Sequence, residues 1–137
     1  MTDASDALSV AAAGMRAQSA RMRIIAENIA NAASTGDAPG SDPYQRQIPI
    51  FEAEMDHATG LEVVRMTGVD ADQSEFDLRF EPGHPAADAD GYVKYPNVQT
   101  LIELMDMREA QRSYEANLNM VESSRRMMER ALDLLRR

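Results

Sequence analysis

Residues 98–137, VQTLIELMDMREAQRSYEANLNMVESSRRMMERALDLLRR, contain neither Pro nor Gly. Apolar residues recur in this stretch at alternating intervals of three and four, which is the spacing of one face of an α-helix. The stripe consists of Leu104, Met107, Gln111, Tyr114, Leu118, Val121, Arg125, Met128, Leu132 and Leu135. A second apolar line widens the face through Met120, Met127, Ala131 and Leu134. The pattern predicts a long amphipathic helix over residues 98–137, with Asn97 as the capping residue at its start.

Residues 1–33 predict a second helix of the same kind, since they contain no Pro and only one Gly, Gly14. Their stripe consists of Leu8, Ala11, Met15, Gln18, Met22, Ile25 and Ile29. Because Ala and Gln make this seam thin, the helix needs a partner to be stable. We expect residues 1–33 and 98–137 to pair antiparallel, in a coiled-coil-like manner, as one helical domain.

Residues 34–97 predict a small β-rich insertion, because they hold all six prolines and all three phenylalanines. Alternation of apolar and polar residues marks a candidate strand at residues 76–81. In this strand, Phe76, Leu78 and Phe80 are expected to form a buried face. Residues 61–66, which alternate less clearly, and residues 44–51, where Pro49 confines the strand to an edge or bulge, are two further candidates. The predicted fold class is therefore mainly α, with two long terminal helices and a β-rich insertion between them.

Charge is distributed unevenly along the chain, whose net charge is −9. Residues 1–33 hold three acidic and three basic side chains, residues 98–137 hold seven of each, and residues 34–97 hold thirteen acidic against four basic. An acidic chain is a poor partner for nucleic acid, because phosphate contacts need clustered Lys and Arg. Balanced helices can pack against copies of themselves, whereas the charges of the insertion, Asp70 and Asp72 among them, are expected to be solvated.

Catalytic, metal and cofactor sites are not predicted, and we expect that the chain is not an enzyme. Cysteine is absent, which excludes disulfides, thiolate ligands and thiol nucleophiles. His57 and His84 are interpreted as surface and turn residues. The stretch Asp88-Ala89-Asp90-Gly91 resembles part of a calcium loop, but the flanking ligand positions hold Ala86 and Asn97, so no calcium site is expected.

Membrane insertion and a cleaved secretory signal are not predicted either. No apolar run approaches the roughly 18 residues that span a bilayer. Residues 1–10 contain no basic residue, and a cleavable signal needs a basic start. The methionines on the helix faces are equally consistent with an ordinary core and with an adaptable binding surface.

Three groups of residues resemble a known protein family. Glu27–Ala32 (ENIANA) resembles the Asn-Ile-Ala-Asn signature near the N-terminus of flagellar axial proteins, and Pro43–Arg46 (PYQR) resembles the Tyr-x-Arg element that follows it. Residues 81–97 (EPGHPAADADGYVKYPN), with residues 112–117 (RSYEAN), resemble the C-type proximal-rod proteins of the flagellar basal body. One departure is the loop at residues 35–43, which separates the first two motifs.

This resemblance implies a structural subunit of the proximal rod, assembled in the periplasm around the export channel. Its implied partners are copies of itself, other rod proteins and the flagellar type III export apparatus, which would export it without signal cleavage. The alternative is a small acidic export chaperone, which shares the size and the acidity. Candidate assembly-interface residues are the helix seams and the motif asparagines: Leu8, Met15, Met22, Ile25, Asn28, Ile29, Asn31, Leu104, Met107, Tyr114, Asn117, Leu118, Val121, Met128, Leu132 and Leu135.

Overall fold

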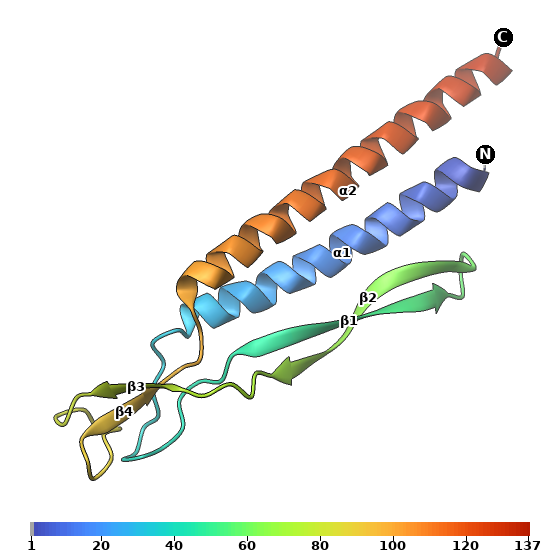
Figure 1. Ribbon diagram of the computed structural model, residues 1–137. Helices are drawn as coiled ribbons and strands as arrows, with labels where there is room; N and C mark the ends of the chain where they lie inside the picture. Colours follow the sequence, from blue (N-terminus) through green and yellow to red (C-terminus); the bar gives the residue numbers. More distant parts are fainter. Residues whose placement is uncertain (1) are drawn as a thin grey trace. The chain divides into compact units, whose positions relative to one another are not determined.

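The computed structural model describes residues 2–137 and contains two long helices with four strands between them (Figure 1). The elements are α1 (Thr2–Ala30), β1 (Gln47–Asp56), β2 (Leu61–Ala71), β3 (Asp77–Phe80), β4 (Tyr92–Tyr95) and α2 (Thr100–Leu135). The order helix, strands, helix agrees with the sequence pattern. The prediction of a mainly α fold is wrong, however, because 47% of the chain is helix and 21% is strand. The class is α+β, since β1 and β2 extend well beyond the short stretches predicted for them.

The start of α2 corrects the predicted cap. Gln99 provides the carbonyl that accepts the first helical hydrogen bond, from the backbone N–H of Glu103 at 3.0 Å. The Asn97 side chain is engaged elsewhere: its Oδ1 accepts from the Arg46 backbone N–H at 2.8 Å, and its Nδ2 donates to the Asp72 carbonyl at 3.0 Å. Asn97 therefore joins two loops to each other and does not cap the helix.

The chain folds into two compact units, each assembled from separate stretches of sequence. The first unit contains residues 2–22, 50–68 and 108–137, and the second contains residues 23–49 and 69–107. Small side chains dominate the buried positions of the first unit, which are Ala11, Ala13, Ala17, Val63, Ala110 and Ser124. Such small side chains let the backbones of neighbouring elements approach closely. The large apolar side chains of this unit therefore lie outside its buried positions.

The second unit contains the hairpin β3–β4, which is antiparallel and pairs Leu78 with Lys94 and Phe80 with Tyr92. The predicted buried face of this strand is wrong, because Leu78 is 59% exposed and Phe80 is 64% exposed. The buried residue is Val93, which pairs with Arg79 and so belongs to the opposite face. Alternation separates the two faces of a strand but does not say which of them is covered.

A cluster of ion pairs joins three segments of the second unit. Glu103, on the first turn of α2, is only 1% exposed, and its Oε1 accepts a hydrogen bond from Arg46 Nε. The same guanidinium lies 3.3 Å from Asp72 Oδ2 and 3.9 Å from Asp106 Oδ2. The backbone also connects these segments, because the Asp72 N–H donates to the Arg46 carbonyl at 2.8 Å. Arg46 thus holds the segment before β1, the segment after β2 and the start of α2 together.

Asp72 is not solvated as expected, since its side chain is only 22% exposed. Its Oδ1 accepts the backbone N–H of Ser74 at 2.8 Å. Hydrogen bonds from the Ser74 backbone and side chain, followed by the Arg46 guanidinium, hold the pKa of this carboxyl below its usual value of 3.8. The structure leaves Asp70 exposed, in agreement with the sequence-based expectation.

Replacing Arg46 with Gln is expected to lower the free energy of unfolding by about 3–5 kcal/mol, because Glu103 then stays buried without its cation. The double variant Arg46→Gln/Glu103→Gln is expected to lose less, since no buried charge remains. Urea unfolding of the purified chain measures both. The matched control is Arg79→Gln, an exposed pair with Asp77 at 3.2 Å, whose loss costs less than about 1 kcal/mol. If Arg46→Gln lowers the free energy of unfolding by no more than Arg79→Gln does, this account is contradicted.

Stability is also expected to depend on the ionisation of Asp72. A carboxyl whose folded pKa is lowered contributes its full stability above its ordinary pKa and loses it as pH falls through the folded value. The difference in unfolding free energy between the wild type and Asp72→Asn should therefore be greater at pH 7 than in acid, and should shrink as pH falls through the folded pKa of Asp72. Urea unfolding at a series of pH values tests this, and a pH-independent difference would rule out the ion-pair role of Asp72.

Candidate assembly surfaces

The contact between α1 and α2 in the first unit uses small residues. A Cβ at Gly14 would lie 2.8 Å from Asn117 Nδ2, and Arg21 Nη2 lies 3.7 Å from Glu109 Oε2. Residue numbers therefore fall along α2 as they rise along α1, so the helices run antiparallel in this unit (Figure 1). Ala110 and Ser124, seven residues on either side of Asn117, are completely buried. The packed line of α2 consists of small and polar side chains.

The sixteen predicted interface residues differ widely in exposure. Two are buried, Ile25 and Asn28. Ten are half-buried: Leu8, Met15, Met22, Ile29, Asn31, Met107, Tyr114, Asn117, Val121 and Met128. Four are exposed, namely Leu104, Leu118, Leu132 and Leu135. The predicted α2 seam is thus split, because one of its lines borders the intramolecular contact and the other points to solvent.

Large apolar side chains remain exposed along α2 in both units. In the first unit they are Leu118, Met120, Met127, Leu132, Leu134 and Leu135, and in the second unit they are Leu101, Ile102, Leu104 and Met105. Their exposed fractions range from 37% for Leu118 to 74% for Leu134. Scattered single apolar residues are ordinary on a protein surface, but a group of six on one helix segment marks an interaction surface. We call the six residues of the first unit the α2 apolar face.

A groove of about 770 Å³ adjoins this face in the first unit. One end of α1 and the C-terminal half of α2 line it, through Asp3, Ala4, Ser5, Ala7, Met120, Ser124, Met127, Met128, Ala131 and Leu132. The lining is mostly apolar, and methionine side chains can adapt to partners of different shape. The Ser124 hydroxyl is buried here without a hydrogen-bond partner among residues 2–137. The groove has the chemistry of a surface that receives apolar side chains.

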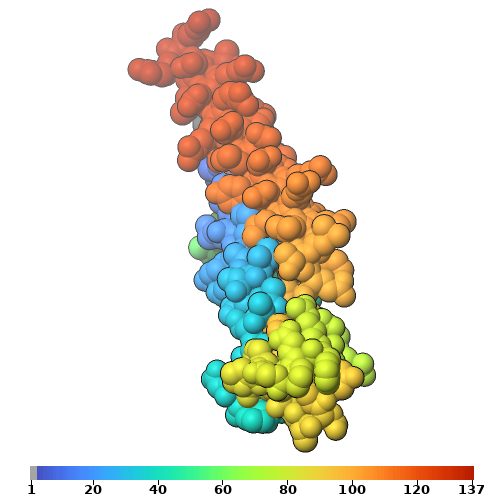
Figure 2. Space-filling view, turned by 90° about the vertical axis from the view of Figure 1, so that its left-hand side faces the viewer, coloured from blue at the N-terminus to red at the C-terminus, as the bar shows by residue number. Residues whose placement is uncertain are grey.

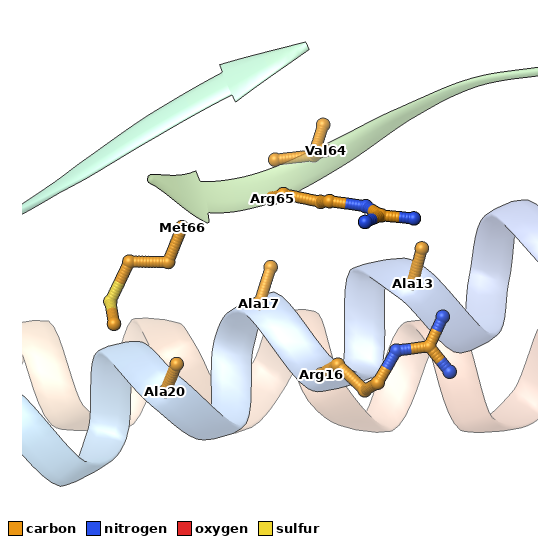
Figure 3. A pocket seen from close by; sticks show the side chains of 7 residues that line it. All are labelled: Ala13, Arg16, Ala17, Ala20, Val64, Arg65 and Met66. Carbon is orange, nitrogen blue, oxygen red and sulfur yellow. The ribbon is translucent and has the colours of Figure 1, made fainter. Parts of the chain in front are cut away.

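A second hollow of about 440 Å³ lies where β2 crosses α1 in the first unit (Figure 3). Ala13, Ala17 and Ala20 point from α1 toward the strand, and Met66 extends from β2 toward the helix. Two guanidinium groups, those of Arg16 and Arg65, lie at one end, and Arg65 is 3.9 Å from Asp56 Oδ1. The hollow lies between β2 and α1, and the seven residues that line it include no carboxylate, histidine or cysteine.

The motif asparagine Asn28 acts within its own chain. Its Nδ2 donates to the Gln47 carbonyl at 2.8 Å, and its Oδ1 accepts from the Gln47 N–H at 2.9 Å and from Tyr44 Oη at 2.8 Å. Burial, followed by the nearby charges of Glu27 and Glu103, raises the pKa of Tyr44. Tyr44 and Arg46 are therefore the two residues that connect the Tyr-x-Arg element to the helices.

Asn31 is held locally, since its Nδ2 donates to the Glu27 carbonyl at 2.9 Å and its Oδ1 accepts from Ser34 Oγ at 3.0 Å. Sequence reasoning missed the roles of Tyr44, Arg46 and Glu103. The available signal was a single charged residue, Glu103, between apolar neighbours at the start of a helix. Its partner lies 57 residues away, and no local pattern identifies it.

Among residues 2–137, no cluster of three His, Cys, Asp or Glu residues is arranged to hold a metal ion. His84 Nδ1 accepts the Ala86 backbone N–H at 3.0 Å, which is an interaction that shapes a turn. Neither helix, over the residues described, is long and apolar enough to cross a bilayer.

Enlarging Gly14 should separate the helices. Gly14→Leu places a large side chain where even a Cβ meets Asn117, so the free energy of unfolding is expected to fall by about 1–3 kcal/mol or more. Ser19→Leu is the matched control, because it adds the same side chain at an exposed position of α1. Thermal unfolding of both variants measures the difference. Equal stability of the two would show that the small-residue contact does not hold the helices.

Comparison with known proteins shows the family. The model described as flagellar basal body rod FlgEFG protein C-terminal matches residues 89–134. The flagellar basal-body rod protein FlgC of Agrobacterium fabrum is 48% identical over 136 residues, covering 99% of this chain and 98% of its own. The FlgC proteins of Aquifex aeolicus and Salmonella typhimurium are 36% and 35% identical, over 97% and 91% of this chain and 98% and 92% of their own. The resemblance drawn from the motifs is thereby confirmed, and the chain belongs to the FlgC family of flagellar basal-body rod proteins.

Proposed function

We propose that this structural subunit of the flagellar basal-body rod assembles through the α2 apolar face. The family supports assembly with other basal-body rod components and a place in the flagellar basal body. It also implies a role that is not enzymatic. Nothing in the comparisons supports the alternative of an export chaperone.

The observation that carries the proposal is the exposure of large apolar side chains on a helix whose charges balance. Residues 98–137 hold seven acidic and seven basic side chains, so copies of this helix do not repel one another. Burial of a large aliphatic side chain in an interface contributes about 1.5–3 kcal/mol. The six exposed side chains of the α2 apolar face provide apolar area for contact with other subunits.

The finer parts of the proposal follow from the family resemblance. Copies of the chain and other rod proteins are its partners, in the periplasmic rod around the export channel. Residues 1–33 and 98–137 supply the axial helices, and the acidic residues 34–97 lie on the solvent side. Export proceeds through the flagellar type III apparatus without removal of a signal peptide.

Introducing a charge into the α2 apolar face should block assembly without unfolding the subunit. Leu118→Asp and Met120→Asp replace side chains that are 37% and 49% exposed, so the isolated subunit tolerates them. In an interface, an unpaired carboxylate costs several kcal/mol. We expect both variants to be made at normal levels, to be absent from purified basal bodies and to abolish motility.

The matched control is Asn119→Asp, which adds the same charge at an exposed polar position between the two. Circular dichroism of each purified variant verifies the fold, and immunoblots of basal bodies measure incorporation. Asn119→Asp should incorporate as the wild type does. Normal incorporation of Leu118→Asp and Met120→Asp would overturn the role of this face.

A further inference from the structure

The hairpin β3–β4 presents an apolar face that its own unit does not cover. Leu78, Phe80 and Tyr92 are 59%, 64% and 44% exposed, and the strand register places all three on the same face. The rings of Phe80 and Tyr92 pack edge to face, with centroids 5.3 Å apart. An exposed cluster of one leucine and two aromatic rings is the composition of a binding surface.

This face is held in a fixed arrangement. Gly91 has φ +85°, and a Cβ there would lie 2.9 Å from the Phe80 ring. The backbone turn before β4 therefore supports the Phe80 ring directly. Asp88 fixes the same turn, because its Oδ1 accepts the backbone N–H groups of Asp90 and Tyr92, both at 2.9 Å. A surface that is already ordered loses little conformational entropy on binding.

The hairpin segment carries a net negative charge. Residues 75–95 contain five acidic and two basic side chains, a net charge of −3. Both basic groups already have carboxylate partners, since Arg79 Nε lies 3.2 Å from Asp77 Oδ2 and Lys94 Nζ lies 3.0 Å from Asp42 Oδ1. Glu75 and Asp90 are exposed and make no ion pair within residues 2–137. A partner that complements this face is therefore an apolar surface flanked by basic side chains.

The C-terminal end of α2 has this complementary chemistry. Residues 125–137 contain five arginines and two acidic side chains, a net charge of +3. Every one of the five arginines is exposed, and none makes an ion pair with any residue from 2 to 137. Leu132, Leu134 and Leu135 are 53%, 74% and 74% exposed beside them. Figure 2 shows this end of α2, in red, uncovered on the side facing the viewer.

We propose that the β3–β4 face of one copy binds residues 125–137 of a second copy. Leu132 and Leu135, three residues apart on one side of the helix, cover Leu78, Phe80 and Tyr92, while the arginines lie near Glu75 and Asp90. This contact joins two different surfaces, so each copy offers one of each and successive copies can associate head to tail. The inference rests on the proposed function, and it adds which surface of one copy meets which surface of the next.

Charge reversal tests the contact with exposed residues that the fold does not need. The face variant Glu75→Lys/Asp90→Lys changes the charge of residues 75–95 from −3 to +1, and the end variant Arg136→Glu/Arg137→Glu changes that of residues 125–137 from +3 to −1. In each variant alone, the two contacting surfaces carry charges of the same sign. Self-association should therefore weaken by at least about tenfold. An equimolar mixture pairs opposite charges at both contacts and should restore association.

Sedimentation velocity of the purified full chain over a range of concentrations is the measurement. The wild type should associate more strongly as concentration rises, and should weaken at least about tenfold when salt rises from about 50 mM to about 300 mM. The matched control is Glu52→Lys/Glu54→Lys, which adds the same charge at exposed positions of β1 and should behave as the wild type. A monomeric wild type, a single variant that associates normally, or a mixture that does not recover would each overturn the proposal.

Immunoblots of purified basal bodies separate this inference from the proposed function. If the proposed function is wrong, Leu118→Asp and Met120→Asp are incorporated as the wild type is. If only the present contact is wrong, the wild type and both charge variants are incorporated in equal amounts. If the contact exists, each charge variant alone is depleted and the control is not.

Discussion

The buried carboxylate of Glu103 requires a cation, and Arg46 is the residue that supplies it. The ion pair between Arg46 and Glu103 brings the segment before β1 to the start of α2. Asp72 joins them through the same guanidinium. The Asn97 side chain binds the Arg46 backbone and the Asp72 carbonyl, which fixes the loop that leads into α2. Asn28 and Tyr44 then connect this arrangement to α1. A single unsatisfied charge would loosen every one of these connections, because they share the same few residues.

Small residues in the first unit have a consequence for the surface. Gly14 and Ala110 fill the contact between α1 and α2, so the large side chains of α2 have no intramolecular place to pack. Those side chains form the α2 apolar face, with its adjoining groove. Thus the subunit is stable with a modest core, and its apolar area remains available for other subunits. Apolar area buried between chains takes the place of part of the apolar area that a monomeric protein buries in its own core.

The helices and their order could be predicted from the sequence because a period of 3.6 residues persists over long stretches that contain no Pro and only one Gly. The identity of the packed face could not, because Ala110, Asn117 and Ser124 carry almost no hydrophobic signal beside Leu118 and Leu132. The exposed face of β3 was assigned to the interior for a related reason, since alternation does not reveal which face meets a neighbour. Asn97 was assigned as a helix cap, and Asp72 as solvated, because Arg46, which contacts both, lies far away in the sequence. The family motifs identified the role of the chain, but they did not reveal that Asn28 and Tyr44 hydrogen-bond each other.

The interleaving of the two units sets the order in which the chain can fold. The Arg46–Glu103 pair spans 57 residues, and the Gly14–Asn117 contact spans most of the chain. Such distant contacts form slowly, because a long loop must close before they contribute any stability. As the N-terminus leaves a ribosome first, α1 and the four strands emerge before the helix that completes each unit. Until α2 follows, neither unit can form the contacts that complete it, so the emerging chain stays only partly folded.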